Sequence, residues 1–311
     1  MKIAVIGTGL VGQAWAIVFA RAGLEVSIWD GNHEALQRAT NIISKQLLEL
    51  QTHGLVSDAT AAMNHIRVAS SLADALEGAD YVQESLPEQV EIKRDFYQHL
   101  DALAKPDAIL ASSTSSIPAS LFTESLPGRH RCLVAHPVNP PYLVPVVELC
   151  GAPWTDAAVI ERARALMELV KQQPVTVHHE VEGFVLNRLQ GALLREAFRL
   201  VEQGVVSVED LDVTVKHGLG LRWSFMGPFE TIDLNAPDGL ADYCKRYGGM
   251  YQSIATEQTD TNPWSEELIH KAQTQRREQL PADKLLDRRL WRDERLMALM
   301  RHKLQFEHTS E

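Results

Sequence analysis

Two patterns of hydrophobic and polar positions alternate along residues 1–182 of the chain. Short runs of β-branched and other apolar residues are separated by segments in which apolar residues recur at helical spacing. The runs are Ile3–Ile6, Glu25–Trp29, Ile66–Ala69, Tyr81–Glu84, Ala108–Ala111, Cys132–Ala135, Val144–Leu149 and Pro174–Val177. Strands that alternate with helices are joined by right-handed crossovers, which produce a mostly parallel sheet covered on both faces. The pattern therefore predicts an α/β domain over residues 1–182.

The strand pattern stops near Gly183, and the remaining chain has only helical spacing. The predicted helices are a long one from Phe184 to Val201, Asp210–Val215, Leu240–Tyr251 and a last one from Leu285. The last helix carries a heptad-like apolar stripe, in which Asp293 takes the place of one apolar residue. Polar residues at Asp260–Pro263 indicate a loop. We therefore expect an all-α domain over residues 183–311.

Composition and charge exclude several classes of protein. The chain has 311 residues, of which 45% are hydrophobic and 23% charged, values typical of globular domains and not of disordered or fibrous chains. A net charge of −11 argues against a general binder of nucleic acids or anionic membranes, because both need a basic surface. No apolar run reaches the length of a membrane span. Three scattered cysteines favour neither a disulfide framework nor a Cys-x-x-Cys zinc site, so we expect a cytoplasmic protein without a metal centre.

A glycine motif follows the first predicted strand. Gly7, Gly9 and Gly12 have the spacing of a dinucleotide-binding turn, in which the first glycine makes the turn, the second admits a pyrophosphate and the third lets helix and strand pack closely. The N–H groups of the first helical turn, which contains Leu10 and Val11, then attract the phosphates. The motif predicts a Rossmann domain.

Asp30 ends the second predicted strand, where a carboxylate can accept hydrogen bonds from the adenosine ribose hydroxyls. Gly31 and Asn32 follow, so no arginine stands beside Asp30 to hold a 2′-phosphate, and the sequence favours NAD over NADP. The alternative is a tight turn on a flavodoxin-like sheet, with Asp30 serving only as the N-cap of the next helix.

Polar segments follow several other predicted strands, at the edge where α/β sheets bind ligands. They are Ser112–Ser116, His136–Pro141, Glu148 and, at the start of the long helix, Gly183–Arg188. Together with Gly218–Arg222, Gly227–Pro228 and Trp291–Asp293, they resemble the 3-hydroxyacyl-CoA dehydrogenase superfamily over nearly the whole chain. The resemblance is closest to its lambda-crystallin branch, which includes L-gulonate 3-dehydrogenase. It implies an NAD-dependent dehydrogenase.

The resemblance implies that His136 and Glu148 form the catalytic pair, and that Ser115 and Asn187 contact the substrate. The chemistry agrees with these roles, because oxidation of an alcohol needs a base for the hydroxyl proton, and a histidine titrates near neutral pH. A glutamate bonded to the other ring nitrogen selects the tautomer and favours the imidazolium. Structural alternatives remain open: the serine run can end a strand and cap a helix, and Asn187 can bond its own helix start.

The resemblance also places cofactor contacts at Glu88 and Lys93, on the nicotinamide side. The alternative for Glu88, which follows Pro87, is a favourable interaction with the first turn of a helix. For Lys93 the alternative is an ordinary solvated lysine. Neither position is decided by the sequence.

The predicted substrate class depends on how many positively charged residues are present to bind phosphate groups. The region His33–Arg67 holds only Arg38, Lys45 and Arg67, which is little for the phosphates of a CoA thioester, so the sequence favours a short free 3-hydroxy acid similar to L-gulonate. A carboxylate favours a bidentate arginine, and Arg222, in a glycine-rich turn, is the candidate, with an interface salt bridge as its alternative.

Three other functions stay open at this point: a 3-hydroxyacyl-CoA dehydrogenase such as one for 3-hydroxybutyryl-CoA, an L-carnitine dehydrogenase, and a catalytically silent, NADH-binding, crystallin-like protein. We also expect a homodimer formed through the helical domain, because its apolar helices exceed what one small bundle needs and twofold pairing is the commonest solution.

Overall fold

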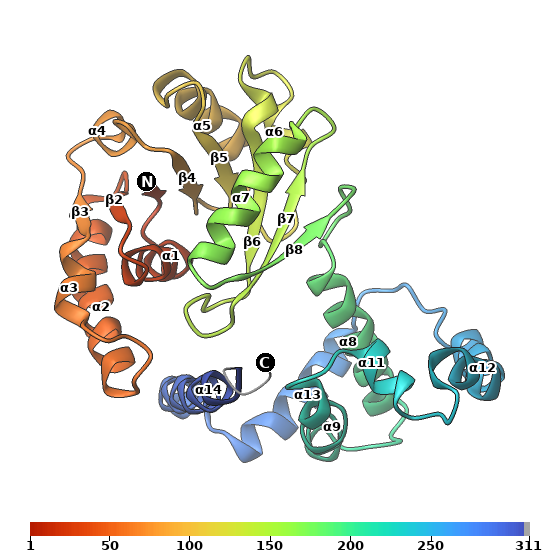
Figure 1. The fold of residues 1–311 in the computed structure, drawn as a ribbon. Coiled ribbons are helices and arrows are strands. Elements are labelled where there is room, and N and C mark those ends of the chain that lie inside the picture. Colours follow the sequence, from red (N-terminus) through yellow and green to blue (C-terminus); the bar gives the residue numbers. More distant parts are fainter. Residues whose placement is uncertain (308–311) are drawn as a thin grey trace. The chain divides into compact units, whose positions relative to one another are not determined.

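The structure is a computed structural model, and it describes residues 1–307. The chain divides into two compact units, Met1–Arg188 together with the segment from Leu290 onward, and Leu189–Arg289. The first unit is built on one eight-stranded sheet (Figure 1). Its strands are β1 (Lys2–Ile6), β2 (Glu25–Trp29), β3 (Ile66–Val68), β4 (Tyr81–Glu84), β5 (Ile109–Ser112), β6 (Cys132–Pro137), β7 (Val146–Gly151) and β8 (Gln173–Val177).

The strand order is β3-β2-β1-β4-β5-β6-β7-β8, and every pair is parallel except β6 with β7. All eight predicted strands are present, with ends shifted by at most two residues. The predicted α/β class with a mostly parallel sheet is confirmed. The order changes direction between β1 and β4, and an open α/β sheet binds its ligand at such a switch point.

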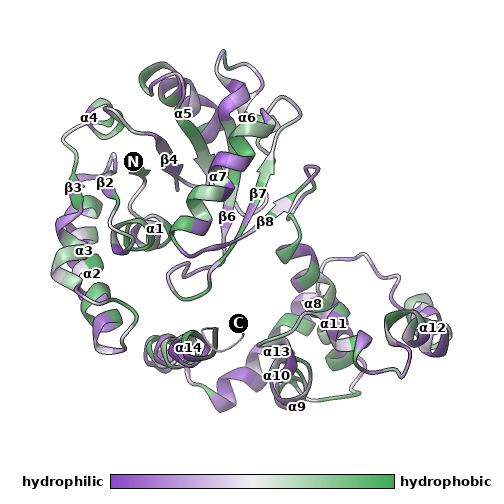
Figure 2. Ribbon diagram, viewed as in Figure 1, coloured by the Kyte–Doolittle hydropathy of each residue, from purple (hydrophilic) through white to green (hydrophobic). Residues whose placement is uncertain are grey.

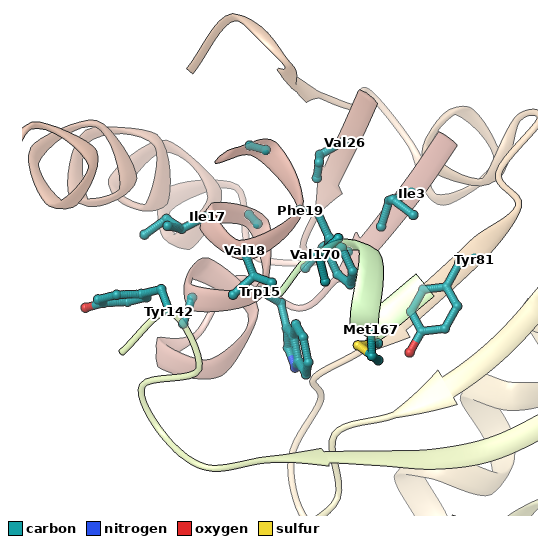
Figure 3. Close-up of a cluster of buried hydrophobic side chains, with 14 of the residues drawn as sticks. Ile3, Trp15, Ile17, Val18, Phe19, Val26, Tyr81, Tyr142, Met167 and Val170 are labelled. Carbon is teal, nitrogen blue, oxygen red and sulfur yellow. The ribbon is translucent and has the colours of Figure 1, made fainter. Parts of the chain in front are cut away.

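Helices cover both faces of this sheet. They are α1 (Leu10–Arg21), α2 (His33–Thr52), α3 (Ala59–Asn64), α4 (Leu72–Leu76), α5 (Val90–Leu103), α6 (Ser120–Thr123) and α7 (Ala157–Leu169). One core joins α1, α2, α3 and α7 to the sheet, and Figure 3 shows part of it, with Trp15 and Phe19 of α1 near Met167 and Val170. The other core lies under α4, α5 and α6 and contains Tyr97 and Phe122. The strands in the middle of the sheet, β1, β4, β5, β6 and β7, are therefore buried almost throughout, which explains their short, continuous apolar sequences, whereas the edge strands β3 and β8 keep exposed residues.

The helices differ in how much of their surface they bury. Every residue of α1 from Gly12 to Ala20 is buried, since this helix packs against the sheet on one side and α2 on another. In contrast, α2 buries one stripe, made of Leu36, Ala39, Ile43, Leu47 and Leu50. Figure 2 shows the result as mixed hydrophilic and hydrophobic colours along α2. A stripe at steps of three and four is the pattern of a helix with one solvent-facing side.

The second unit is helical. Its elements are the greater part of α8 (Leu186–Glu202), α9 (Val208–Thr214), a π-helical turn (Val215–Leu219), α10 (Gly220–Trp223), α11 (Pro228–Asp233), α12 (Gly239–Glu257), α13 (Glu266–Gln279) and the start of α14 (Leu285–Glu307). The predicted helices and the loop at Asp260–Pro263 are present. One detail was wrong: Arg222 does not lie in a turn but in α10, because Gly218 and Gly220 continue a helical backbone.

The C-terminal segment packs with the first unit. Met297 of α14 is only 5% exposed and belongs to the same core as Leu47 and Tyr142. Of the predicted heptad stripe, Leu286 and Leu290 are exposed. The predicted domain boundary at residue 183 stays a prediction, and the compact units differ from it by grouping the end of α14 with the sheet. Within the described residues, none of the helices combines the length and apolarity that crossing a membrane requires.

Candidate active site

The three glycines of the motif have different surroundings. Gly7 directly follows β1 with a φ of +88°, and a Cβ there would lie 2.7 Å from the carbonyl oxygen of Ser85. A Cβ on Gly12 would lie 1.8 Å from the carbonyl oxygen of Gly7, so this position requires glycine for packing of helix on strand. Gly9 has an ordinary φ of −68°, and no atom lies within 4 Å of its Cβ position. The fold itself therefore does not require glycine at position 9, whereas a pyrophosphate placed there does.

Gly9 is also the N-cap of α1, and no side chain caps the helix. Leu10 and Val11 form the first turn behind it, and Leu10 is 71% exposed. Uncapped N–H groups at the start of a twelve-residue helix attract an anion through both hydrogen bonding and the helix dipole. This end of α1 fits the pyrophosphate of a dinucleotide.

Asp30 stands directly behind the glycine loop. Its Oδ2 accepts hydrogen bonds from the N–H and the hydroxyl of Thr8, at 2.7 and 3.0 Å, and its Oδ1 accepts one from the N–H of Asn32. The N-cap of α2 is Asn32, whose side chain accepts from the N–H of Ala35. The structure thus removes the alternative in which Asp30 caps that helix. Asp30 instead lies where a carboxylate can meet the ribose hydroxyls.

His136 and Glu148 face each other across the antiparallel pair β6 and β7, where they are directly opposite in register. His136 Nδ1 lies 2.8 Å from Glu148 Oε2, and both side chains are buried. Nε2 of His136 makes no hydrogen bond within residues 1–307. An imidazole held through Nδ1 presents Nε2 to a ligand, which is the arrangement that a base needs.

Glu148 is held as a carboxylate on its other side as well. Its Oε1 accepts from the N–H groups of Val185 and Leu186, at 2.8 and 3.0 Å, just before α8. Burial raises the pKa of Glu148, but the hydrogen bonds from His136, Leu186 and Val185 and the charge of His136 outweigh it, so the pKa lies below its ordinary value. Glu148 therefore remains ionised beside His136 at neutral pH.

Ser115 and Asn187 adjoin each other. Asn187 Nδ2 donates to the carbonyl oxygen of Ser115 at 2.7 Å, so its side chain does not bond its own helix start. Asn187 comes directly after Leu186, which is bonded to Glu148. The hydroxyl of Ser115 is exposed and makes no hydrogen bond within the described chain. The structure links four of the five residues that the sequence suggested as catalytic or substrate-binding, namely His136, Glu148, Ser115 and Asn187, and does not link Arg222 to them.

Glu88 organises the Ser115 loop. Its Oε1 accepts from the Thr114 hydroxyl at 2.5 Å, from the N–H groups of Ser115 and Ser116 at 2.9 and 3.0 Å, and from the Ser116 hydroxyl at 3.2 Å. Burial raises the pKa of Glu88, but these hydrogen bonds and the charge of Lys93 together hold it below its ordinary value. Its Oε2 makes no hydrogen bond within residues 1–307 and remains available to a ligand.

The structure removes one of the two alternatives for Lys93, and its predicted contact with the cofactor stays a prediction. Lys93 is not a solvated lysine, because its side chain is 1% exposed, and its Nζ donates to both oxygens of Glu84, at 2.9 and 3.0 Å. Glu84 was not among the residues predicted for the site. A charged residue at the end of the apolar strand Tyr81–Glu84 is the signal that points to it, since a buried charge needs a partner.

Arg222 belongs to the second unit, where it is exposed and its side chain forms no hydrogen bond or ion pair with the described residues. The alternative of a salt bridge therefore has no support inside the described part of the chain. A role in substrate binding stays a prediction.

Comparisons with known proteins agree with this geometry. Residues 2–181 match the family described as "3-hydroxyacyl-CoA dehydrogenase, NAD binding domain", and residues 183–281 match "3-hydroxyacyl-CoA dehydrogenase, C-terminal domain". The lambda-crystallin homolog of Rattus norvegicus is 40% identical over 97% of both chains. An L-carnitine dehydrogenase of a Pseudomonas species is 39% identical over 79% of this chain and 76% of its own.

Among solved structures, an NAD⁺-dependent 5-formyl-3-hydroxy-2-methylpyridine 4-carboxylic acid 5-dehydrogenase has a TM-score of 0.83. It is 29% identical and covers 96% of this chain and 97% of its own. The predicted resemblance, including the lambda-crystallin branch, is confirmed, and NAD is the cofactor. The chain belongs to the 3-hydroxyacyl-CoA dehydrogenase family and is an NAD-dependent oxidoreductase that acts on a CH–OH group.

Proposed function

We propose that this enzyme oxidises the 3-hydroxyl group of a short, free hydroxy acid similar to L-gulonate, giving the 3-keto acid. The observation that carries the proposal is the buried pair of His136 Nδ1 and Glu148 Oε2, 2.8 Å apart, with Nε2 of the histidine unbonded. His136 lies near the carboxyl end of β6. Glu148 accepts a hydrogen bond from Leu186, the neighbour of Asn187, and Asn187 donates one to Ser115.

In the proposed reaction, His136 Nε2 takes the proton of the substrate hydroxyl. The bound NAD supplies the hydride acceptor. Glu148 keeps the proton on Nδ1 and stabilises the imidazolium that forms, because its own charge is maintained by the N–H groups of Val185 and Leu186. Without Glu148 the wrong tautomer becomes accessible, and the base loses its orientation.

Ser115 and Asn187 are proposed to hold the reacting oxygen. Ser115 is exposed, and the Asn187 amide donates one N–H to the Ser115 carbonyl, whereas its second N–H has no partner among the described residues. Donors aimed at an oxygen that gains negative charge in the transition state commonly contribute a few kcal/mol, about 2.7–4 in measured cases. The hydrogen bond between the two residues fixes their mutual position.

The charges around α2 and α3 support a free acid over a CoA thioester. Each of the three cations in His33–Arg67 already has an acidic partner: Arg38 with Glu34 at 3.6 Å, Lys45 with Glu49 at 3.8 Å and Arg67 with Asp74 at 2.5 Å. A phosphate group would have to compete for them. Arg222 has no such partner within residues 1–307, and we propose it as the group that binds the substrate carboxylate.

Steady-state kinetics test the substrate class. Initial rates of NADH formation should be compared for L-gulonate, other short 3-hydroxy acids, L-carnitine and 3-hydroxybutyryl-CoA. We expect the highest kcat/KM with a free acid. A thioester with a much higher kcat/KM would overturn the proposed substrate class but leave the family assignment intact.

His136→Ala tests the proposed base. The variant should bind NADH as the parent does and lose turnover, because the side chain lies at the substrate and not in the glycine loop. Unchanged turnover would remove His136 from the mechanism. If the parent protein has no activity on any of these substrates, the crystallin-like, catalytically silent alternative is favoured.

L-carnitine is the second candidate substrate, since relatives with 37–39% identity are L-carnitine dehydrogenases. Carnitine carries a trimethylammonium group as well as a carboxylate, and such a group is bound by aromatic or acidic side chains. A higher kcat/KM for L-carnitine than for any sugar acid would select this candidate.

We also propose that the protein is a cytoplasmic homodimer. Helix α12 of the second unit supports the dimer, because none of its 19 residues is buried. Its large apolar side chains are exposed to solvent: Tyr247 by 41%, Met250 by 50% and Tyr251 by 49%. Exposed apolar residues on one helix in such number indicate an interface. Sedimentation at micromolar concentration tests it, and a purely monomeric species would refute the dimer.

A further inference from the structure

We propose that Glu84 is a positioning residue, with Lys93 as its buried counter-charge. It fixes the relative position of two loops: the one after β4 that contains Glu88, and the one after β5 that contains Ser115. The part that concerns NADH rests on the family assignment, whereas the part that concerns Ser115 rests on the proposed function. Glu84 touches neither ligand in this scheme; it acts through the two loops.

Glu84 is placed between these loops by the sheet. It is the last residue of β4, is paired in register with Ser112, the last residue of β5, and has no exposed surface. Oε1 accepts from the N–H of Leu86 at 2.5 Å, which turns the chain just after β4. Oε2 accepts from the hydroxyl of Ser112 at 2.6 Å, where the Ser112–Ser116 loop begins. One carboxylate thus bonds the starts of both loops.

Lys93 completes the shell of this carboxylate. It lies in the first turn of α5, and its three N–H donors meet three acceptors: the two oxygens of Glu84 and the hydroxyl of Ser112 at 3.3 Å. The ammonium group and the carboxylate neutralise each other in a buried place, and Lys93 fixes the orientation of the Glu84 carboxylate.

The two loops are joined a second time nearer to the surface. Glu88, on the first loop, accepts from Thr114, Ser115 and Ser116 on the second. The carbonyl of Ser115 then accepts from Asn187. Because Glu84 fixes where both loops leave the sheet, a change at Glu84 shifts Glu88 and Ser115 together. A positioning role thus predicts coupled losses in NADH affinity and in turnover.

A second buried ion pair in the same unit provides a matched control. Arg131 and Asp101 are joined at 2.8 Å, and their side chains are 5% and 8% exposed. Asp101 also lies on α5, but its other bonds go to the backbone at Gly128, away from both loops. Loss of this pair should cost stability comparably, because either substitution leaves a buried charge unpaired.

The test compares Glu84→Gln and Lys93→Met with Asp101→Asn and Arg131→Met. Thermal unfolding gives the stability loss of each, NADH fluorescence titration gives Kd, and steady-state kinetics separate kcat from KM. We expect Glu84→Gln and Lys93→Met to raise the Kd for NADH about tenfold and to lower kcat, whereas the control variants keep Kd within about twofold at an equal loss of stability. Equal Kd changes in both pairs, or no change in either, would overturn the proposal.

Ser112→Ala keeps the proposal testable if the charged variants do not fold. It removes the hydrogen bond from the Ser112 hydroxyl to Glu84 and the bonds that this hydroxyl accepts from Lys93 and Thr114, but leaves the ion pair of Glu84 with Lys93 in place. We expect a folded variant with a smaller loss of stability than the charged variants, a Kd for NADH raised several-fold and a lower kcat. Parent values of both would contradict the role of Glu84. The NADH titration needs no substrate, so it tests the role of Glu84 even if the proposed hydroxy acid is not the substrate. An error in the proposed substrate would appear only in the substrate kinetics.

Discussion

Replacing Gly9 by alanine should weaken NADH binding without destabilising the protein, and replacing Gly12 by alanine should destabilise it. The two glycines belong to one motif, but their surroundings differ. The Cβ position of Gly9 has no neighbour within 4 Å and its backbone is in the extended region, whereas a Cβ on Gly12 would lie 1.8 Å from a backbone oxygen. The same substitution therefore tests two different roles.

The magnitudes follow from these surroundings. At Gly12 helix α1 must move away from β1, and overpacking of a core costs about 3 kcal/mol at the upper end of its usual range. At about 2–4 °C per kcal/mol for a unit of this size, the melting temperature should fall by about 6–12 °C. At Gly9 alanine fits the backbone and restricts the unfolded chain, which stabilises by about 0.4–1 kcal/mol.

The loss at Gly9 appears in cofactor affinity. A methyl group at the start of α1 keeps the pyrophosphate from the helical N–H groups, and a lost hydrogen bond to a charged group costs about 1.5–3 kcal/mol, at least about tenfold in Kd. Thermal unfolding without cofactor and fluorescence titration with NADH measure the two effects. If Gly9→Ala lowers the melting temperature as Gly12→Ala does, or binds NADH as the parent does, the assignment of Gly9 to the pyrophosphate is wrong.

Three further predictions concern the proposed catalytic pair, the proposed site of the substrate carboxylate and the second unit. Glu148→Gln should lower kcat by about 10²-fold or more while NADH affinity stays unchanged, because the amide no longer selects the histidine tautomer. The same variant tests the lowered pKa of Glu148. A carboxyl whose folded pKa is depressed stabilises the fold above its unfolded pKa of about 4.3 and loses this contribution as pH falls. The difference in unfolding free energy between parent and variant should therefore shrink below that pH in denaturant titrations, and a difference independent of pH would contradict it. Arg222→Ala should raise KM for a free hydroxy acid and leave the Kd for NADH unchanged, and an unchanged KM would remove Arg222 from the substrate site. Met250→Lys should shift the protein toward monomer in sedimentation experiments, because it replaces an apolar side chain of α12 that is 50% exposed by a charged one. An unaltered oligomer would exclude the exposed side of α12 as the interface.

The secondary structure was largely predictable because its signals are local. The strands in the middle of the sheet are buried on both faces, so their runs of apolar residues are visible without knowledge of their neighbours. All eight predicted strands are present. The glycine turn after the first strand and the place of Asp30 after the second were predictable for the same reason, since a turn, a helix start and a strand end are each formed by neighbouring residues. Arg222 shows the limit of such signals, because Gly218 and Gly220 suggested a turn and the chain there is helical.

The pairings within the site depend on contacts that are distant along the chain. His136 and Glu148 were paired from the resemblance, but their opposition in register comes from the one antiparallel pair in the sheet, β6 with β7. Whether Lys93 is solvated, bound to a cofactor or buried depends on where β4 and α5 lie relative to each other. Apolar spacing does not report this, because a lysine at a given helical position has the same sequence pattern in all three cases.

The sequence by itself determined the α/β class and the family with its NAD cofactor, and it supplied the candidates for the catalytic side chains. Only the tertiary structure decided that Glu84 receives Lys93, Ser112 and Leu86, that Glu88 ties the Ser115 loop, and that Asp30 bonds Thr8 and leaves the helix cap to Asn32. The physical reason is that the two kinds of feature depend on interactions over different distances along the chain. Periodicity and turn chemistry are properties of neighbouring residues, whereas the partners of a buried charge are selected by the packing of elements that come together only when the sheet forms.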